Sequence, residues 1–130
     1  MASQELFLVT LVVDDCDKAK TFYCDALGFD CVEDTQMDAI RRWLVVRPPG
    51  TSGAALLLAK ADGEDQRAAV GKQAGGRVGF FLRTDDFARD YKALLANGVR
   101  FVEEPRHEVY GTVVVFEDLH GNRWDLLEPV

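Results

Sequence analysis

Asp125 is the residue whose chemistry and setting first suggest a functional role. It lies within a short apolar segment, residues 124–127, that follows a run of turn-forming residues and is predicted to be a strand. Side chains alternate along a strand, so Asp125 shares one face with Leu127 while Trp124 and Leu126 occupy the other. A carboxylate that points into a cleft must find a partner, because burying an isolated charge is costly.

The residues alone allow two interpretations of Asp125. The carboxylate anchors a cationic or hydrogen-bonding group of a ligand, or it pairs with an arginine such as Arg123 or Arg42. The sequence leaves both open. Trp43 and Trp124 could stack on a planar ligand, although tryptophans in strands more often belong to a core.

The two histidines, His107 and His120, are the candidate nitrogen ligands for a metal. His107 follows Pro105 at a strand entrance, and His120 lies in a turn. With Glu108 or Asp118 they could form an unusual metal site, but their spacing does not require one. The simpler interpretation is that both are solvated loop residues.

Composition narrows the class of protein. The 130 residues suffice for one domain, and the net charge of −7 argues against nucleic acid and against an anionic membrane surface. No apolar run reaches membrane-spanning length, and the first residues do not resemble a signal peptide. The three cysteines, an odd number without a CxxC spacing, are typical of reduced thiols, so we expect a cytoplasmic protein.

Asp125 must be positioned by a hairpin, since residues 112–116 are β-branched or aromatic and Gly121 or Asn122 can supply the turn between the two arms. Strands are also predicted from runs of apolar, β-branched and aromatic residues at 6–13, 29–33, 41–47, 54–59, 77–84, 99–103, 109–117 and 123–127. Two helices carry apolar stripes within residues 19–27 and 87–95, and they end at Gly28 and Gly98. Residues 60–76 are polar and glycine-bearing, which indicates a surface connection with one helical turn around residues 66–70.

The pattern repeats within the chain. Asp14 and Asp15 recur 71 positions later as Asp85 and Asp86, and Gly28 recurs 70 positions later as Gly98. At the offset of 70, residues 43–46 fall on 113–116 and residues 56–57 on 126–127. The chain therefore consists of two βαβββ modules, each of which would bury only one face of its sheet by itself.

These features resemble the vicinal oxygen chelate superfamily, which includes glyoxalase I, the fosfomycin- and bleomycin-resistance proteins and the extradiol dioxygenases. The matching segments are residues 11–15 (LVVDD), 22–23 (FY), 27–29 (LGF) and 117–127 (EDLHGNRWDLL). The last is similar to the family's D-P-D-G-N-x-x-E-L ending. The resemblance implies an α+β fold in which the two modules pair into a curved mixed sheet with a concave groove. It also implies one domain over residues 1–130, with module 1 at about 5–60, a connection at 61–76 and module 2 at about 77–130.

The resemblance also implies where a metal would sit. Enzymes of the superfamily hold a divalent cation with side chains on the first and fourth strands of each module. Those positions fall here on Leu8, Ala55, Gly79 and Asp125. Three of the four have no donor atom, and one carboxylate does not hold a catalytic cation in water. We therefore predict no metal and no cofactor, and we assign no catalytic residue.

The same mapping directs one strand face, that of Phe81, Gly79 and Arg83, into the groove. The predicted ligand-binding residues are Asp125, Phe81, Tyr110, Arg42 and His107.

The function expected from this resemblance is binding of a small organic molecule, cationic or aromatic, without the usual catalytic metal. The bleomycin-resistance type of protein is the nearest example. The alternative is a metal-dependent enzyme of lyase or dioxygenase type whose metal site is reduced or relocated. A third is an assembly role in which the groove is filled by the protein's own side chains. A homodimer is implied by the resemblance alone.

Overall fold

The computed structural model describes residues 2–50 and 53–130. The chain forms two compact units, Met1–Val70 and Gly71–Val130, and each is described by itself. Across the described residues, no helix has the length and apolar character needed to cross a membrane.

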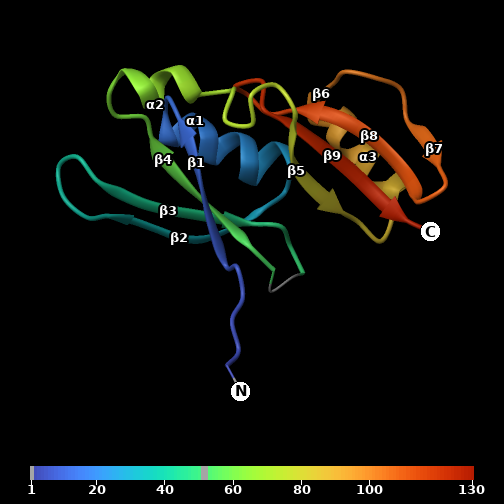
Figure 1. The fold of residues 1–130 in the computed structure, drawn as a ribbon, viewed down its shortest axis with the longest axis horizontal. Helices are drawn as coiled ribbons and strands as arrows, with labels where there is room; N and C mark the ends of the chain where they lie inside the picture. Colours follow the sequence, from blue (N-terminus) through green and yellow to red (C-terminus); the bar gives the residue numbers. More distant parts are fainter. Residues whose placement is uncertain (1, 51–52) are drawn as a thin grey trace. The chain divides into compact units, whose positions relative to one another are not determined.

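The first unit contains one four-stranded sheet with the order β1-β4-β3-β2. β1 and β4 run parallel, and the other neighbouring strands are antiparallel. Its elements are β1 (Leu8–Val13), α1 (Cys16–Thr21), the π-helical turn η1 (Phe22–Ala26), β2 (Asp30–Gln36), β3 (Arg42–Arg47), β4 (Ala55–Lys60) and α2 (Glu64–Ala69) (Figure 1).

The first helix ends before Gly28, as predicted, but its last turn is not an α-turn. The Asp15 side chain accepts a hydrogen bond from the backbone N–H of Lys18, which caps the helix start. At the other end the N–H of Leu27 bonds to the carbonyl of Phe22, five residues back, so the helix widens to a π-turn. Gly28 then adopts a φ of 78°, which reverses the chain into β2.

The second unit repeats the connectivity of the first. Its sheet has the order β5-β9-β8-β6, with β7 also paired to β8, and its first and last strands again run parallel. The two predicted βαβββ modules are thus confirmed. The elements are β5 (Val78–Arg83), α3 (Phe87–Ala96), β6 (Arg100–Phe101), β7 (Arg106–Glu108), β8 (Gly111–Glu117) and β9 (Arg123–Pro129).

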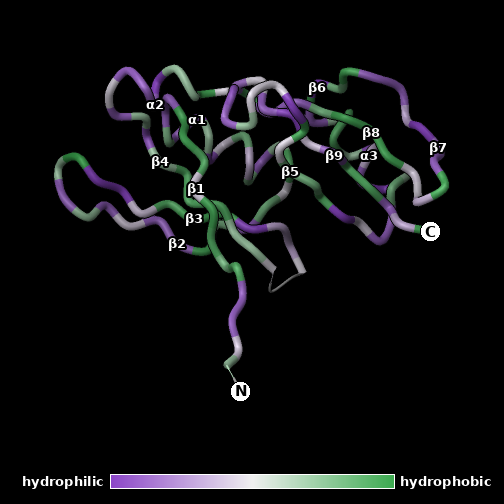
Figure 2. Tube along the Cα trace, in the orientation of Figure 1, coloured by the Kyte–Doolittle hydropathy of each residue, from purple (hydrophilic) through white to green (hydrophobic). Residues whose placement is uncertain are grey.

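Apolar residues follow the central strands of both units, whereas the connection through α2 is largely hydrophilic (Figure 2). In the second unit, Trp124 stacks on Phe80, with ring centroids 4.7 Å apart, and on Phe116 at 5.9 Å. Phe101 continues this aromatic core from Phe116 to Tyr91 of α3. The helix therefore covers the face of the sheet to which Trp124 belongs. Trp43 differs, because its side chain stays 38% exposed on β3.

The region before β8 departs from the prediction. Residues 99–103 were predicted as one strand and 109–117 as another, but β6 spans only two residues and the unpredicted strand β7 precedes β8. Val109 and Tyr110 form the β7–β8 turn rather than the start of a strand, although both are good strand formers. The backbone hydrogen-bond ladder along β8 is interrupted at Val115, because the Glu103 carboxylate, in place of a backbone carbonyl, accepts the hydrogen bond from the Val115 N–H.

The predicted turn of the final hairpin is built around a buried carboxylate. Asp118 Oδ1 accepts hydrogen bonds from the backbone N–H groups of His120 and Asn122, and Oδ2 accepts one from the Asn122 side-chain amide. Gly121 supplies the left-handed residue with a φ of 93°. Asp118 therefore orients β9 relative to β8.

We expect Asp118→Ala to lower the free energy of unfolding by about 3 kcal/mol, because three donors lose their acceptor in a buried turn. Urea denaturation measures this loss. The matched control is Asp85→Ala, which removes an exposed ion pair with Arg89 and should change stability little. Equal losses in the two variants would contradict a structural role for the buried turn.

Candidate functional site

Asp125 lies in the middle of the second sheet, on the face opposite Trp124. Its register partners are Phe81 on β5 and Val115 on β8. On β5, Phe81 alternates with the helix-facing Phe80. We call the face that carries Asp125, Phe81, Val115 and Leu127 the open face. The predicted division of Asp125 and Leu127 from Trp124 and Leu126 agrees with the burial along β9.

The Asp125 carboxylate is half-buried and incompletely paired. Its Oδ1 atom is enclosed and accepts no hydrogen bond from the residues that the structure describes. Burial raises the pKa of Asp125; the nearby positive charge of Arg106 opposes the shift, and the negative charge of Glu103 adds to it. Neither arginine that the sequence suggested as a partner contacts it, so the simple ion-pair interpretation is wrong for this carboxylate.

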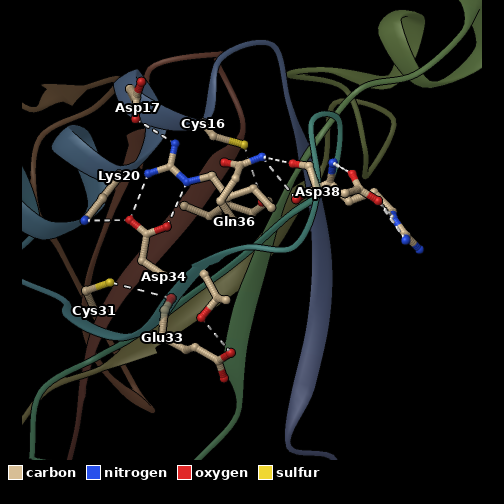
Figure 3. A network of polar contacts seen from close by, with 12 residues as sticks. Cys16, Asp17, Lys20, Cys31, Glu33, Asp34, Gln36 and Asp38 are labelled. Atoms are coloured by element: carbon tan, nitrogen blue, oxygen red, sulfur yellow. Dashed lines mark hydrogen bonds and ion pairs between the residues drawn. The ribbon is translucent and has the colours of Figure 1, made fainter.

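Those two arginines are engaged elsewhere. Arg123 faces Glu117, with Nε and Oε2 3.9 Å apart. Arg42 belongs to an ion-pair network in the first unit, where it donates to Asp34 and to Asp17, and Asp34 also accepts from Lys20 (Figure 3). The hydrogen bonds from Arg42 and Lys20 hold the pKa of Asp34 far below its usual range. The guanidinium of Arg42 thus joins α1 to β2 and β3.

Arg106 is the charged residue near Asp125 that the sequence reasoning missed. Its Nε lies 3.0 Å from both carboxylate oxygens of Glu103, and Nη1 lies 3.0 Å from Glu108 Oε1. These bonds, with one that Arg106 donates to the Tyr110 hydroxyl oxygen, raise the pKa of Arg106 above its usual range, Glu103 contributing most. Glu103 in turn holds the N–H of Val115, the register partner of Asp125. Arg106 is therefore a fixed cation, already shared by two carboxylates.

The signal for this cluster was weak in the sequence. Residues 103–108, EEPRHE, look like a polar segment interrupted by proline, and their internal-repeat positions, residues 33–38 (EDTQMD), carry no cation that corresponds to Arg106. Arg106 reaches the site only because β7 pairs with β8 in the register Arg106 to Val113. A strand pairing over three residues leaves little trace in hydrophobic periodicity.

The other predicted ligand-binding residues do not all lie on the open face. The Phe81 side chain is 67% exposed on the open face, and Tyr110 is half-exposed beside Arg106. His107 pairs in register with Thr112, and its Nδ1 lies 3.2 Å from the Thr112 hydroxyl. Because strand side chains alternate, His107 faces away from Arg106. The structure thus sets Phe81 beside Asp125, places Tyr110 next to Arg106, and directs His107 to the other face.

A family model for the Glyoxalase/Bleomycin resistance protein/Dioxygenase superfamily matches residues 6–126. The chain belongs to this superfamily. An uncharacterized protein of Shewanella frigidimarina is 52% identical over 126 residues, covering 96% of this chain and 93% of that protein.

Solved structures of the superfamily's fold agree over the whole chain. The crystal structure of UcmS2 has a TM-score of 0.83 and 32% identity, with 98% of each chain covered. TnmS3, described as an antibiotic-binding protein from Streptomyces sp. CB03234, has a TM-score of 0.79 and 32% identity, covering 100% of this chain and 99% of TnmS3. Our chain is similar to both along its full length.

The metal positions of this superfamily are not suited to a cation in this chain. Leu8 and Ala55 are register partners, as two ligand positions should be, but both are aliphatic. In the second unit Asp125 pairs with Phe81 rather than with Gly79, because the strand register shifts between Val78 and Phe80. The described part of the chain contains no group of three or more His, Cys, Asp or Glu side chains placed to hold a metal ion. The donor set does not fit the superfamily's divalent cation.

We expect Asp125→Asn to stabilise the protein at pH 7. The folded state raises the pKa of Asp125 above its unfolded value of about 3.9, so the ionised carboxylate costs stability at neutral pH. The advantage of the variant should shrink as the pH falls through the folded pKa and vanish below about pH 4. Melting temperatures of both proteins from pH 7 to pH 4 measure this.

The control is Asp65→Asn, at an exposed position of α2, which should show no such pH-dependent advantage. A lower melting temperature for Asp125→Asn at pH 7 would mean that the carboxylate makes a net stabilising contact.

Proposed function

We propose that this protein binds a small organic molecule on the open face of its second unit, through Asp125 and Phe81, and without the divalent metal used by enzymes of the superfamily. The ligand carries an aromatic ring and a cationic or hydrogen-bond-donating group. The finding that carries this proposal is the enclosed Asp125 Oδ1 atom, which accepts no hydrogen bond within the described chain.

An enclosed carboxylate oxygen without a donor is costly, and folded proteins keep few of them. A ligand that donates an N–H or O–H group to Oδ1 would remove this cost on binding. A cationic donor would do so best, because charge-assisted hydrogen bonds are about twice as strong as neutral ones. Asp125 is thus a better ligand anchor than a structural residue.

Phe81 supplies the apolar half of the proposed site. It is the register partner of Asp125, and its ring is 67% exposed although Phe is usually a core residue. An aromatic ligand stacked on this ring would bury it and leave the polar group of the ligand near Asp125. A cation on the ligand could also face the ring.

Arg106 controls how much negative charge the site presents. If its guanidinium paired directly with Asp125, the carboxylate would be neutralised. Glu103 and Glu108 instead occupy the Arg106 donors on Nε and Nη1, so Asp125 keeps an oxygen for a ligand. Arg106 is a positioning residue in this proposal, because it holds Glu103 and Tyr110 around the site.

Relatives support binding rather than catalysis. TnmS3, whose sequence is 32% identical, is described as an antibiotic-binding protein, and a crystal structure described as a glyoxalase/bleomycin resistance protein from the same Streptomyces strain is also 32% identical. We propose a similar binding role for this chain, as a cytoplasmic homodimer.

Light scattering after gel filtration tests the dimer: a mass near twice 14.5 kDa is expected.

We expect thermal-shift screening with cationic aromatic drugs, bleomycin among them, to find compounds that raise the melting temperature, because a ligand bound only to the folded state stabilises it by mass action. Neutral aromatic diols form the second arm of the screen. For a cationic hit, Asp125→Asn should weaken Kd by roughly 10–100-fold, as expected when a charge-assisted hydrogen bond is lost. Phe81→Ala should weaken it by roughly tenfold. Isothermal calorimetry measures both.

Leu95→Ala is the matched control, since this exposed side chain lies on α3, in the helix layer of the same unit. It should leave Kd unchanged. The proposal would be contradicted if no compound bound, or if neither Asp125→Asn nor Phe81→Ala changed the affinity.

Elemental analysis of protein purified without chelator tests the alternative: a stoichiometric divalent metal required for binding would favour a metal-dependent enzyme.

A further inference from the structure

A small hollow in the second unit has a charge opposite to that of the whole chain. It lies where the loop after Gly71 meets the start of β5 and the β8–β9 turn, and it encloses about 200 Å³ including the open space at its mouth. Most of this volume is open to solvent, and the enclosed part has room for little more than one water molecule, so a bound group would lie at the mouth of the hollow.

The hollow is lined by three cations, Lys72, Arg77 and Arg123, and by no carboxylate. This composition is notable in a chain with a net charge of −7. Lys72 and Arg77 form no ion pair with any residue that the structure describes. The positive charge at the hollow is therefore largely uncompensated.

The nearby carboxylates do not neutralise it. Glu117 lies 3.9 Å from Arg123 Nε, but it also lies 3.4 Å from Arg100 Nε, so one carboxylate serves two guanidinium groups. Asp118 directs its oxygens to the backbone and side chain of its own turn. An anion entering the hollow would find donors that are not already engaged.

Glycines allow the loop to approach the hairpin closely enough to form the hollow. A Cβ atom at Gly71 would lie 2.1 Å from the carbonyl oxygen of His120, and the φ of Gly71 is 77°. A Cβ atom at Gly79 would lie 2.8 Å from the Cβ atom of Ala74. Both contacts exclude larger residues, so the loop is packed against the turn and the strand by its own sequence.

We propose that this hollow is an oxyanion-binding site that takes a phosphate-like group. Lysine provides a point charge and arginine a planar pair of donors, which together suit a tetrahedral oxyanion. The site is separate from the Asp125 carboxylate in charge and in chemistry, and it does not depend on the proposed organic ligand.

Inorganic phosphate is the direct probe, titrated into the ¹⁵N-labelled full chain and followed by amide chemical shifts. Saturable shifts are expected within residues 71–80 and 121–123, the two segments that supply the lining of the hollow. The double variant Lys72→Glu plus Arg77→Glu should weaken phosphate binding at least tenfold, because two attractive charges become repulsive. The control Arg67→Glu plus Lys92→Glu changes the net charge equally at exposed positions outside the hollow and should leave the affinity unchanged.

Phosphate monoesters and acetate, titrated in parallel, distinguish the source of the anion. Tighter binding of a monoester than of free phosphate would assign the site to a phosphorylated molecule, and tighter binding of acetate would overturn the phosphate assignment. Non-saturating shifts up to about 50 mM phosphate, or equal weakening in the two double variants, would show general charge attraction and would overturn the proposal.

Discussion

The stacking of Trp124 against Phe80 and Phe116 determines which way the last strand faces. Because the Trp124 indole is buried under α3 and strand side chains alternate, Asp125 must lie on the opposite face of the sheet. Parallel pairing of β9 with β5 then sets Phe81 beside Asp125. The open face, where we propose that the ligand binds, is thus a consequence of core packing on the other side of the same sheet. A register shift of one residue in β9 would move Asp125 to the helix-covered face and Trp124 to the open face.

The charge arrangement around Asp125 is not the one that would maximise stability. A carboxylate half-buried in a strand would be most stable beside a free arginine, yet Arg106 is held by Glu103 and Glu108. The resulting rise in the pKa of Asp125 marks a position at which the fold tolerates an unfavourable charge. Such positions are typical of binding sites, where a ligand completes the interactions that the protein leaves open.

The two modules share a topology but use their polar residues differently. In the first unit the charges are paired with one another: Arg42 joins Asp17 and Asp34, and Lys20 adds to Asp34 (Figure 3). The equivalent of Asp125 in that unit is Ala55, whose neighbour Leu8 is also aliphatic. Duplication has therefore kept the strand order while the chemistry diverged, and the open carboxylate belongs to the second unit.

The sequence by itself determined the repeat, the βαβββ succession of elements in each module, the helix ends at Gly28 and Gly98, and the face on which Asp125 lies. These features depend on local propensity and on periodicity, which a linear sequence contains in full. Only the tertiary structure decided the partners of Asp125, because ion pairs between distant segments depend on strand register. The Glu103–Arg106 cluster arises from a three-residue strand and a side chain that replaces a backbone acceptor, and neither feature has a periodic pattern.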